Sequence, residues 1–258
     1  MEAFIDKQKL LNPKEKWDAN GLLITAYQIY IGGLLKNEAV YKQPKWSGKM
    51  VHHLGESHSL SYANCLLEID GATHKVQPHL IVGAKAWHFA MSKVSRYKTF
   101  LENIIKRIPD GEFVLLSFGE IDCRHNEGII SHCDKTGAEI TKVIRKTVQG
   151  YTIYIDKIFQ SKPKCRLYFL GIPAPVNRPD VKFEAMQNVA FVISVFNAEL
   201  GKAVKALGHH FIDIYSFTKK ERGFSNGLYH VDETHLGPTA IPKINELLSN
   251  VRNFRSIT

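Results

Sequence analysis

Short apolar runs alternate with long amphipathic runs from residue 49 onward. The runs at 113–118 and 167–171 are short and mostly apolar, which is typical of strands buried on both faces. An Asp70-Gly71 turn between apolar runs predicts a hairpin. The pattern also predicts strands at 49–54 and 211–214 and helices over 84–108, 140–159, 181–207 and 241–251. This alternation of strand and helix predicts a flavodoxin-like three-layer α/β/α sandwich with a mainly parallel sheet.

Residues 1–48 differ from the rest and form a lead-in to this pattern. Apolar residues at helical spacing (Leu22, Leu23, Ala26, Ile29 and Tyr30) precede a polar stretch at 41–45. We therefore expect a helical N-terminal extension at 1–48 and one α/β domain at 49–258. The apolar stretch at 21–35 contains Gln28 and is shorter than the roughly 20 residues that a membrane span needs. With no basic segment before an apolar one at the start of the chain, the expected location is cytoplasmic.

Composition narrows the classes of protein that remain. Hydrophobic residues make up 44% and charged residues 23%, as in a globular domain, and four cysteines exclude a disulfide scaffold. The 34 basic and 25 acidic residues give a net charge of +9. The basic residues are scattered and lack interleaved aromatic residues, so no nucleic-acid partner is expected. No glycine-rich dinucleotide or phosphate-binding loop occurs, and no cofactor is expected.

Polar residues follow the predicted strands at the edge where open parallel sheets place their sites. Gly55-Glu56-Ser57-His58-Ser59 follows the first strand, and Ser57 is either a helix N-cap or an exposed nucleophile. Gly83 follows the hairpin, and it is either a turn glycine or a donor whose N–H faces a ligand. Both segments would lie at one edge of the sheet.

Two Asp-x-x-His segments offer a base and an acid to a nucleophilic serine. One is Asp122 to His125, in a polar segment directly after the 113–118 strand, and the other is Asp232 to His235. Either could instead be an ordinary polar turn or an ion-paired loop. The second pair is favoured, because it lies after the final strand and just before the closing helix.

Taken in order, these segments resemble the blocks of the SGNH/GDSL hydrolase superfamily over roughly residues 49–251. Gly55-Glu56-Ser57-His58-Ser59 resembles the first block, Gly83 the second, Gly119-Glu120-Ile121-Asp122 the third and Asp232-x-x-His235 the last. The resemblance implies a triad of Ser57, His235 and Asp232, with the N–H groups of Ser57 and Gly83 as the oxyanion hole. It also implies acyl transfer through an acyl-enzyme.

Two positions depart from the family pattern. Glu56 stands where the family has aspartate, and Ile121 stands where it has an asparagine whose side chain donates to the oxyanion. Loss of one such donor costs about 10²–10³ in rate. Arg124, His125 and Asn126 are the candidates to substitute for this donor, and Asp122 is a further candidate for supporting the site.

The function that the resemblance implies is a serine esterase acting on an O-acyl group, expected to be O-acetyl, on a small molecule or a glycan. An O-acyltransferase of polysaccharide biosynthesis would use the same triad. A degenerate glycan-binding module would retain the cleft without turnover. A separate alternative is a zinc site, because Cys123, His125, His132 and Cys133 lie within eleven residues. Its spacing matches no familiar zinc motif, and no metal is expected.

Overall fold

Within residues 19–38 and 46–252, which the computed structural model describes, one six-stranded sheet has the order β2-β3-β1-β4-β5-β6. Only β2 is antiparallel to its neighbour. The five parallel strands follow the 2-1-3-4-5 order of flavodoxin-like folds. The strands are β1 (Lys49–Gly55), β2 (Leu66–Ile69), β3 (Ala72–Leu80), β4 (Phe113–Ser117), β5 (Arg166–Leu170) and β6 (His210–Ile212).

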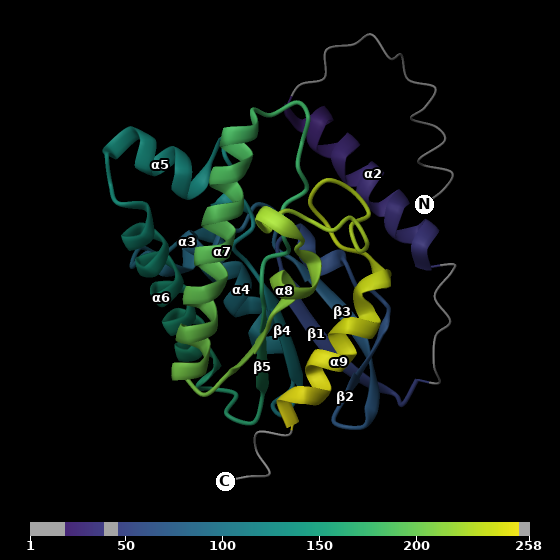
Figure 1. Ribbon diagram of the computed structural model, residues 1–258. Coiled ribbons are helices and arrows are strands. Elements are labelled where there is room, and N and C mark those ends of the chain that lie inside the picture. The colour runs from purple at the N-terminus through teal and green to yellow at the C-terminus, as the bar shows by residue number, and fades with distance from the viewer. Residues whose placement is uncertain (1–18, 39–45, 253–258) are drawn as a thin grey trace.

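Helices cover both faces of this sheet (Figure 1). One face packs against α3 (Ala86–Ala90), α4 (Arg96–Arg107), α6 (Ile140–Phe159) and α7 (Phe183–Ala206). The other face packs against α9 (Ile241–Arg252). The short helices α5 (Gly128–Thr136) and α8 (Ile214–Thr218) complete the layers. The predicted three-layer α/β/α sandwich is therefore confirmed.

Strand β4 shows how the sequence builds both cores at once. Successive side chains of a strand point to opposite faces. Val114 and Leu116 accordingly join the core under α6 and α7, while Phe113 and Leu115 join the core under α9. Each buried side chain of this size contributes about 1.5–3 kcal/mol relative to an exposed one. The central place of β4 in the sheet therefore explains its four consecutive apolar residues, Phe113 to Leu116.

The predicted hairpin is present, with β2 and β3 joined at Asp70 and Gly71. Both turn residues have positive φ, 52° at Asp70 and 73° at Gly71. A two-residue type I′ turn requires this geometry, and Asp-Gly adopts it readily.

Two predicted elements are wrong in detail. The helix expected over 84–108 is two helices, α3 and α4, because the Ser95 side chain accepts the N–H of Lys98 and starts a new helix there. Val94, whose position fits the apolar spacing of one continuous helix over 84–108, is 79% exposed between them. The strand expected at 211–214 ends at Ile212 and lies at the edge of the sheet, while Ile214 begins α8.

Helix α2 (Ala19–Glu38) comes from the predicted N-terminal extension, of which residues 1–18 and 39–45 lie outside the described residues. It contacts the turn at Pro238–Ala240 and lies near the carboxyl ends of the central strands (Figure 1). Its Tyr30 side chain is 1% exposed. Among the described residues, none of the helices is both long enough and apolar enough to cross a membrane.

Candidate active site

A cavity of about 990 Å³ opens at the carboxyl ends of the central strands. Ser57 follows β1, Gly83 follows β3, and Glu120 to Glu127 follow β4. The chain continues from β1 to β3 on one side and then to β4 on the other side of β1. Open α/β sheets form their ligand crevices at such a switch point. The remaining walls come from α2, the loop after β5, α7 and the 231–235 loop.

Three side chains separated widely in sequence form a hydrogen-bonded chain at this cavity. Ser57 Oγ lies 2.7 Å from His235 Nε2, and His235 Nδ1 lies 2.7 Å from Asp232 Oδ2. A serine hydroxyl bonded to an imidazole, which is in turn oriented by a carboxylate, is the arrangement that activates a serine nucleophile. The structure thus brings together the three residues of the predicted triad.

The loop around Asp232 explains why this pair adopts that geometry. Asp232 Oδ1 accepts the N–H groups of Thr234 and His235 at 2.7 and 2.6 Å, which closes a tight turn. Its other oxygen is left for the His235 ring. Burial would raise the pKa of Asp232, but the hydrogen bond and charge of His235 outweigh burial and lower it. The carboxylate therefore stays ionised beside the imidazole.

The other Asp-x-x-His segment has a different role. Asp122 is 1% exposed and accepts the N–H groups of Ala86 and Trp87 at 2.7 and 3.0 Å. These two bonds fix the start of α3, which lies shortly after Gly83, and Asp122 itself does not line the cavity. Burial raises the pKa of Asp122 to about 7 despite these bonds. His125 lines the cavity instead of pairing with this carboxylate.

The predicted oxyanion donors, the N–H groups of Ser57 and Gly83, belong to residues that line the same cavity. Gly83 has a φ of 71°, a conformation that favours glycine. Within the described residues, neither N–H has a hydrogen-bond acceptor. Both are therefore available to a ligand.

Among the described residues, several side chains rather than one are candidates to replace the family's asparagine donor, which is absent at Ile121. Ile121, Arg124, His125 and Asn126 all line the cavity. The Arg124 guanidinium is held by Glu120 at 2.7–3.0 Å and by Glu127 at 3.3 Å, which fixes it at the wall. Arg124 and Asn126 carry N–H donors on this side, so the wall keeps polar donors although position 121 is apolar.

Sequence reasoning gave no site role to Tyr30, yet its ring stacks on the His235 imidazole. The ring centroids lie 3.8 Å apart at an interplanar angle of 17°. The Tyr30 hydroxyl lies 2.9 Å from Ser61 Oγ and donates to the Ser57 carbonyl at 3.3 Å. Tyr27, one helical turn earlier, lines the same cavity. Tyr30 stood in the apolar pattern of the lead-in, which indicated burial but not its partner.

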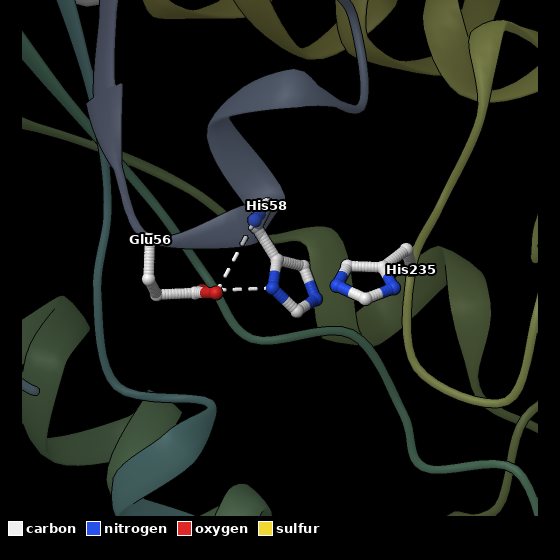
Figure 2. Close-up of side chains that lie close together, drawn as sticks. All are labelled: Glu56, His58 and His235. Carbon is white, nitrogen blue, oxygen red and sulfur yellow. Dashed lines mark hydrogen bonds and ion pairs between the residues drawn. The ribbon is translucent and has the colours of Figure 1, made fainter. Parts of the chain in front are cut away.

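A buried ion pair lies directly beside the triad (Figure 2). Glu56 Oε1 lies 2.8 Å from His58 Nδ1, and the two side chains are 1% and 8% exposed. The His58 Nε2 contacts the carbonyl of Thr234 at 3.2 Å, so this ring joins the β1 end to the triad loop. Figure 2 shows the His58 ring beside that of His235, and their centroids are 4.8 Å apart.

Among the described residues, the cluster proposed from Cys123, His125, His132 and Cys133 does not form a site with metal-ligand spacing. Cys123 is instead buried in the core under α6 and α7, and Cys133 packs against that core. The group with the closest spacing is Glu56, His58 and His235. Its ligand atoms are engaged with one another and with Ser57, as a hydrogen-bonded network would have them, and we assign no metal to it.

Comparison of the structure with solved structures identifies the class of fold. A GDSL-like lipase from Bacteroides thetaiotaomicron matches at a TM-score of 0.50 and 16% identity, over 88% of this chain and 98% of that one. A provisionally assigned acylhydrolase from Bacteroides fragilis matches at 0.50 and 15%, over 88% and 97%. A provisionally assigned platelet activating factor from Streptococcus pneumonia matches at 0.51 and 15%, over 91% and 94%. No protein-family model and no curated protein matches the sequence.

The chain therefore has the fold of the GDSL-like lipases and acylhydrolases. At the level of the fold, this confirms the resemblance to the SGNH/GDSL hydrolase superfamily that the sequence blocks indicated.

Proposed function

We propose that this protein is a serine esterase that cleaves an O-acyl ester through an acyl-enzyme on Ser57. The observation that carries the proposal is the Ser57–His235–Asp232 chain, with both contacts at 2.7 Å, at the wall of a large cavity. The shared fold with GDSL-like lipases and acylhydrolases supports it. A binding module that catalyses no reaction would not need a serine, a base and an acid in one hydrogen-bonded chain.

The geometry supports a two-step mechanism. Ser57 Oγ attacks the ester carbonyl while its proton passes to His235 Nε2, and the new oxyanion accepts the N–H groups of Ser57 and Gly83. Collapse breaks the bond to the alcohol oxygen, which takes the proton from His235. Water then attacks the acyl-Ser57 ester with His235 again as base, and the acid is released. Asp232 keeps Nδ1 protonated and stabilises the transient imidazolium.

The lining of the cavity combines apolar and charged side chains. The apolar ones come from the loop after β5 and from α7: Pro173, Pro175, Val176, Met186, Val189 and Ile193. The charged ones pair with one another, among them Lys85 with Glu127 and Arg178 with Glu233. At about 990 Å³ the cavity greatly exceeds an acetyl group. An O-acetyl substrate would therefore use most of this space for its alcohol part, which leaves room for a sugar.

A fluorophosphonate probe tests the proposal. We expect the intact protein to gain one phosphonyl group, and S57A to gain none, because only a serine activated by a base attacks the probe rapidly. The adduct is read from the intact mass, and its position from a peptide digest. A folded wild-type protein that acquires no adduct, and hydrolyses no small acetyl ester, would overturn the proposed function.

The chain provides a matched control in a second serine–histidine contact. Ser225 Oγ lies 2.9 Å from His230 Nδ1, and Ser225 also follows a Gly-x sequence. The structure gives His230 no carboxylate hydrogen bond among the described residues, and Ser225 does not line the cavity. S225A should therefore label as the wild type does.

Tyr30 should affect turnover through its ring. Replacing it by alanine removes the stacked face of His235, and we expect kcat/KM for an aryl acetate to fall about 10- to 100-fold because the base is no longer held in place. Y30F keeps the ring and loses hydroxyl contacts worth about 1 kcal/mol. Equal losses in Y30A and Y30F would show that the hydroxyl, and not the stacked ring, is what matters.

A further inference from the structure

The Ser57 hydroxyl faces two acceptors and has one proton. Its Oγ lies 2.7 Å from Glu56 Oε2 and also 2.7 Å from His235 Nε2. An ionised carboxylate only accepts, and a neutral imidazole nitrogen without hydrogen only accepts. Both contacts are therefore satisfied together only when His235 carries a proton on Nε2. When His235 is neutral, Glu56 competes with it for the proton that catalysis must deliver to His235.

The charge of Glu56 is balanced chiefly by His58, with smaller contributions from His235 and Arg124. Burial would raise the pKa of Glu56, but the His58 charge and the hydrogen bonds from His58 and Ser57 lower it. Burial would lower the pKa of His58, but Glu56 outweighs burial and raises it. The distances agree with this direction, since Nδ1 of His58 lies 2.8 Å from a Glu56 carboxylate oxygen and Nε2 lies 3.2 Å from the Thr234 carbonyl oxygen. The raised pKa of about 9 and two oxygen neighbours that only accept both favour the imidazolium form of His58.

We propose, resting on the proposed function, that Glu56 is a second acceptor for the Ser57 proton and that the His58 cation limits its strength. The Glu56–His58 pair thereby sets the pH at which His235 becomes free to act as the base. Glu56 is a catalytic residue in this scheme, since it contacts the reacting hydroxyl. His58 is a positioning residue, which acts through Glu56 and through the Thr234 carbonyl next to His235.

The remaining groups around the cluster do not provide the same control. They are Asp232 and His230 from the triad loop, Glu120 and Arg124 after β4, His53 in β1, and Tyr27 and Tyr30 on α2. Burial lowers the pKa of His53 to about 3 and that of His230 to about 4, so both rings stay neutral near pH 7. Arg124 stays charged because it pairs with Glu120 and Glu127. Unlike all of these surrounding groups, Glu56 carries a full charge and also contacts Ser57 Oγ.

The test is the acidic limb of kcat/KM for an aryl acetate, measured from pH 5 to 8.5 in buffer containing EDTA. H58Q removes the cation that balances Glu56, so the cluster around Ser57 should take up a proton more readily. The midpoint of the acidic limb should therefore rise by about one pH unit. E56Q removes the anion, so the midpoint should fall. In the double variant E56Q/H58Q the midpoint should equal that of E56Q, because His58 acts through Glu56.

A matched control is H209Q, which breaks another histidine–carboxylate pair, His209 Nε2 to Asp156 Oδ1 at 2.9 Å. This pair lies at the amino end of β6, the opposite edge of the sheet from the cavity, and its loss should not move the midpoint. A purely structural role for His58 predicts lower activity with an unchanged midpoint. Unchanged midpoints, or shifts of H58Q and E56Q in the same direction, would overturn the inference.

A second measurement needs neither activity nor a folded variant. In ¹⁵N-histidine-labelled wild-type protein at pH 7, the His58 ring should show two protonated nitrogens. A neutral His58 would overturn the inference whatever the esterase does. A charged His58 in a protein that takes no fluorophosphonate would instead overturn the proposed function, so the two failures can be told apart.

Discussion

Replacing Ser57 by alanine should lower kcat/KM for an acetyl ester by about 10⁴-fold or more, because the variant has no group to form the acyl-enzyme. The fold should tolerate the change, since Ser57 contributes one hydroxyl at a cavity wall and is 8% exposed. The measurement is steady-state hydrolysis of an aryl acetate, with the melting temperature of each variant as a control for folding. Loss of activity together with loss of folding would not support the triad.

The triad should also act as a unit. H235A should cost about as much as S57A, and the double variant S57A/H235A should cost little more than either, because removing one member already disables the proton transfer. D232N should remain folded, but its amide cannot hold Nδ1–H in place, and a fall of about 10⁴ is expected. Additive losses in the double variant would show that Ser57 and His235 serve separate roles.

Asp122 should have the largest effect on stability among the residues of the blocks. D122A leaves the N–H groups of Ala86 and Trp87 without their acceptor, and Ala86 is fully buried. Unpaired buried donors cost about 1–3 kcal/mol each, so the free energy of unfolding should fall by about 3 kcal/mol. Urea denaturation measures this loss. D122N keeps one side-chain acceptor and should lose less, and equal losses in both would contradict the role of these two bonds.

The same residue predicts a pH dependence with a definite sign. The pKa of Asp122 is about 7 in the folded chain and ordinarily 3.8, so the folded state binds a proton there that the unfolded state releases. Its contribution to stability is fully present below pH 4 and is lost as the pH rises to about 7, by up to about 4 kcal/mol. The stability of wild type relative to D122N should therefore be greater at pH 4.5 than at pH 8. A difference that does not change with pH would contradict the shifted pKa.

The strands and the triad residues were predictable because their patterns are local or positional. A mostly apolar run such as Phe113 to Ser117 indicates a central strand, and a polar segment after it must lie at the carboxyl edge. The break between α3 and α4 was missed because Ser95 can either continue a helix or cap one. Val94 kept the apolar spacing across the break, although its side chain faces solvent.

The contacts of Tyr30 and His58 were not predictable from the sequence. Tyr30 lies 205 positions before His235, and spacing along the chain cannot reveal a stacked pair at such a separation. His58 stood within the first block, but its significance depends on Glu56. Glutamate is one methylene longer than the aspartate of the family pattern, and here its carboxylate contacts both His58 and Ser57. From the sequence, glutamate at position 56 indicated only a departure from the family pattern, whereas in the structure Glu56 forms a buried ion pair with His58.

The stacking of Tyr30 on His235 has a consequence for how such a site can be altered. All three residues of the proposed triad belong to the α/β sandwich, but one face of the His235 ring is covered by a helix that precedes the first strand. Tyr27 and Ile29 of the same helix line the cavity. Exchanging the segment 19–38 for another helix would therefore reshape the entrance and the setting of the base while every strand stayed in place. The proposed chemistry would thus stay with the sandwich, while the fit of a substrate could be changed by grafting one helix.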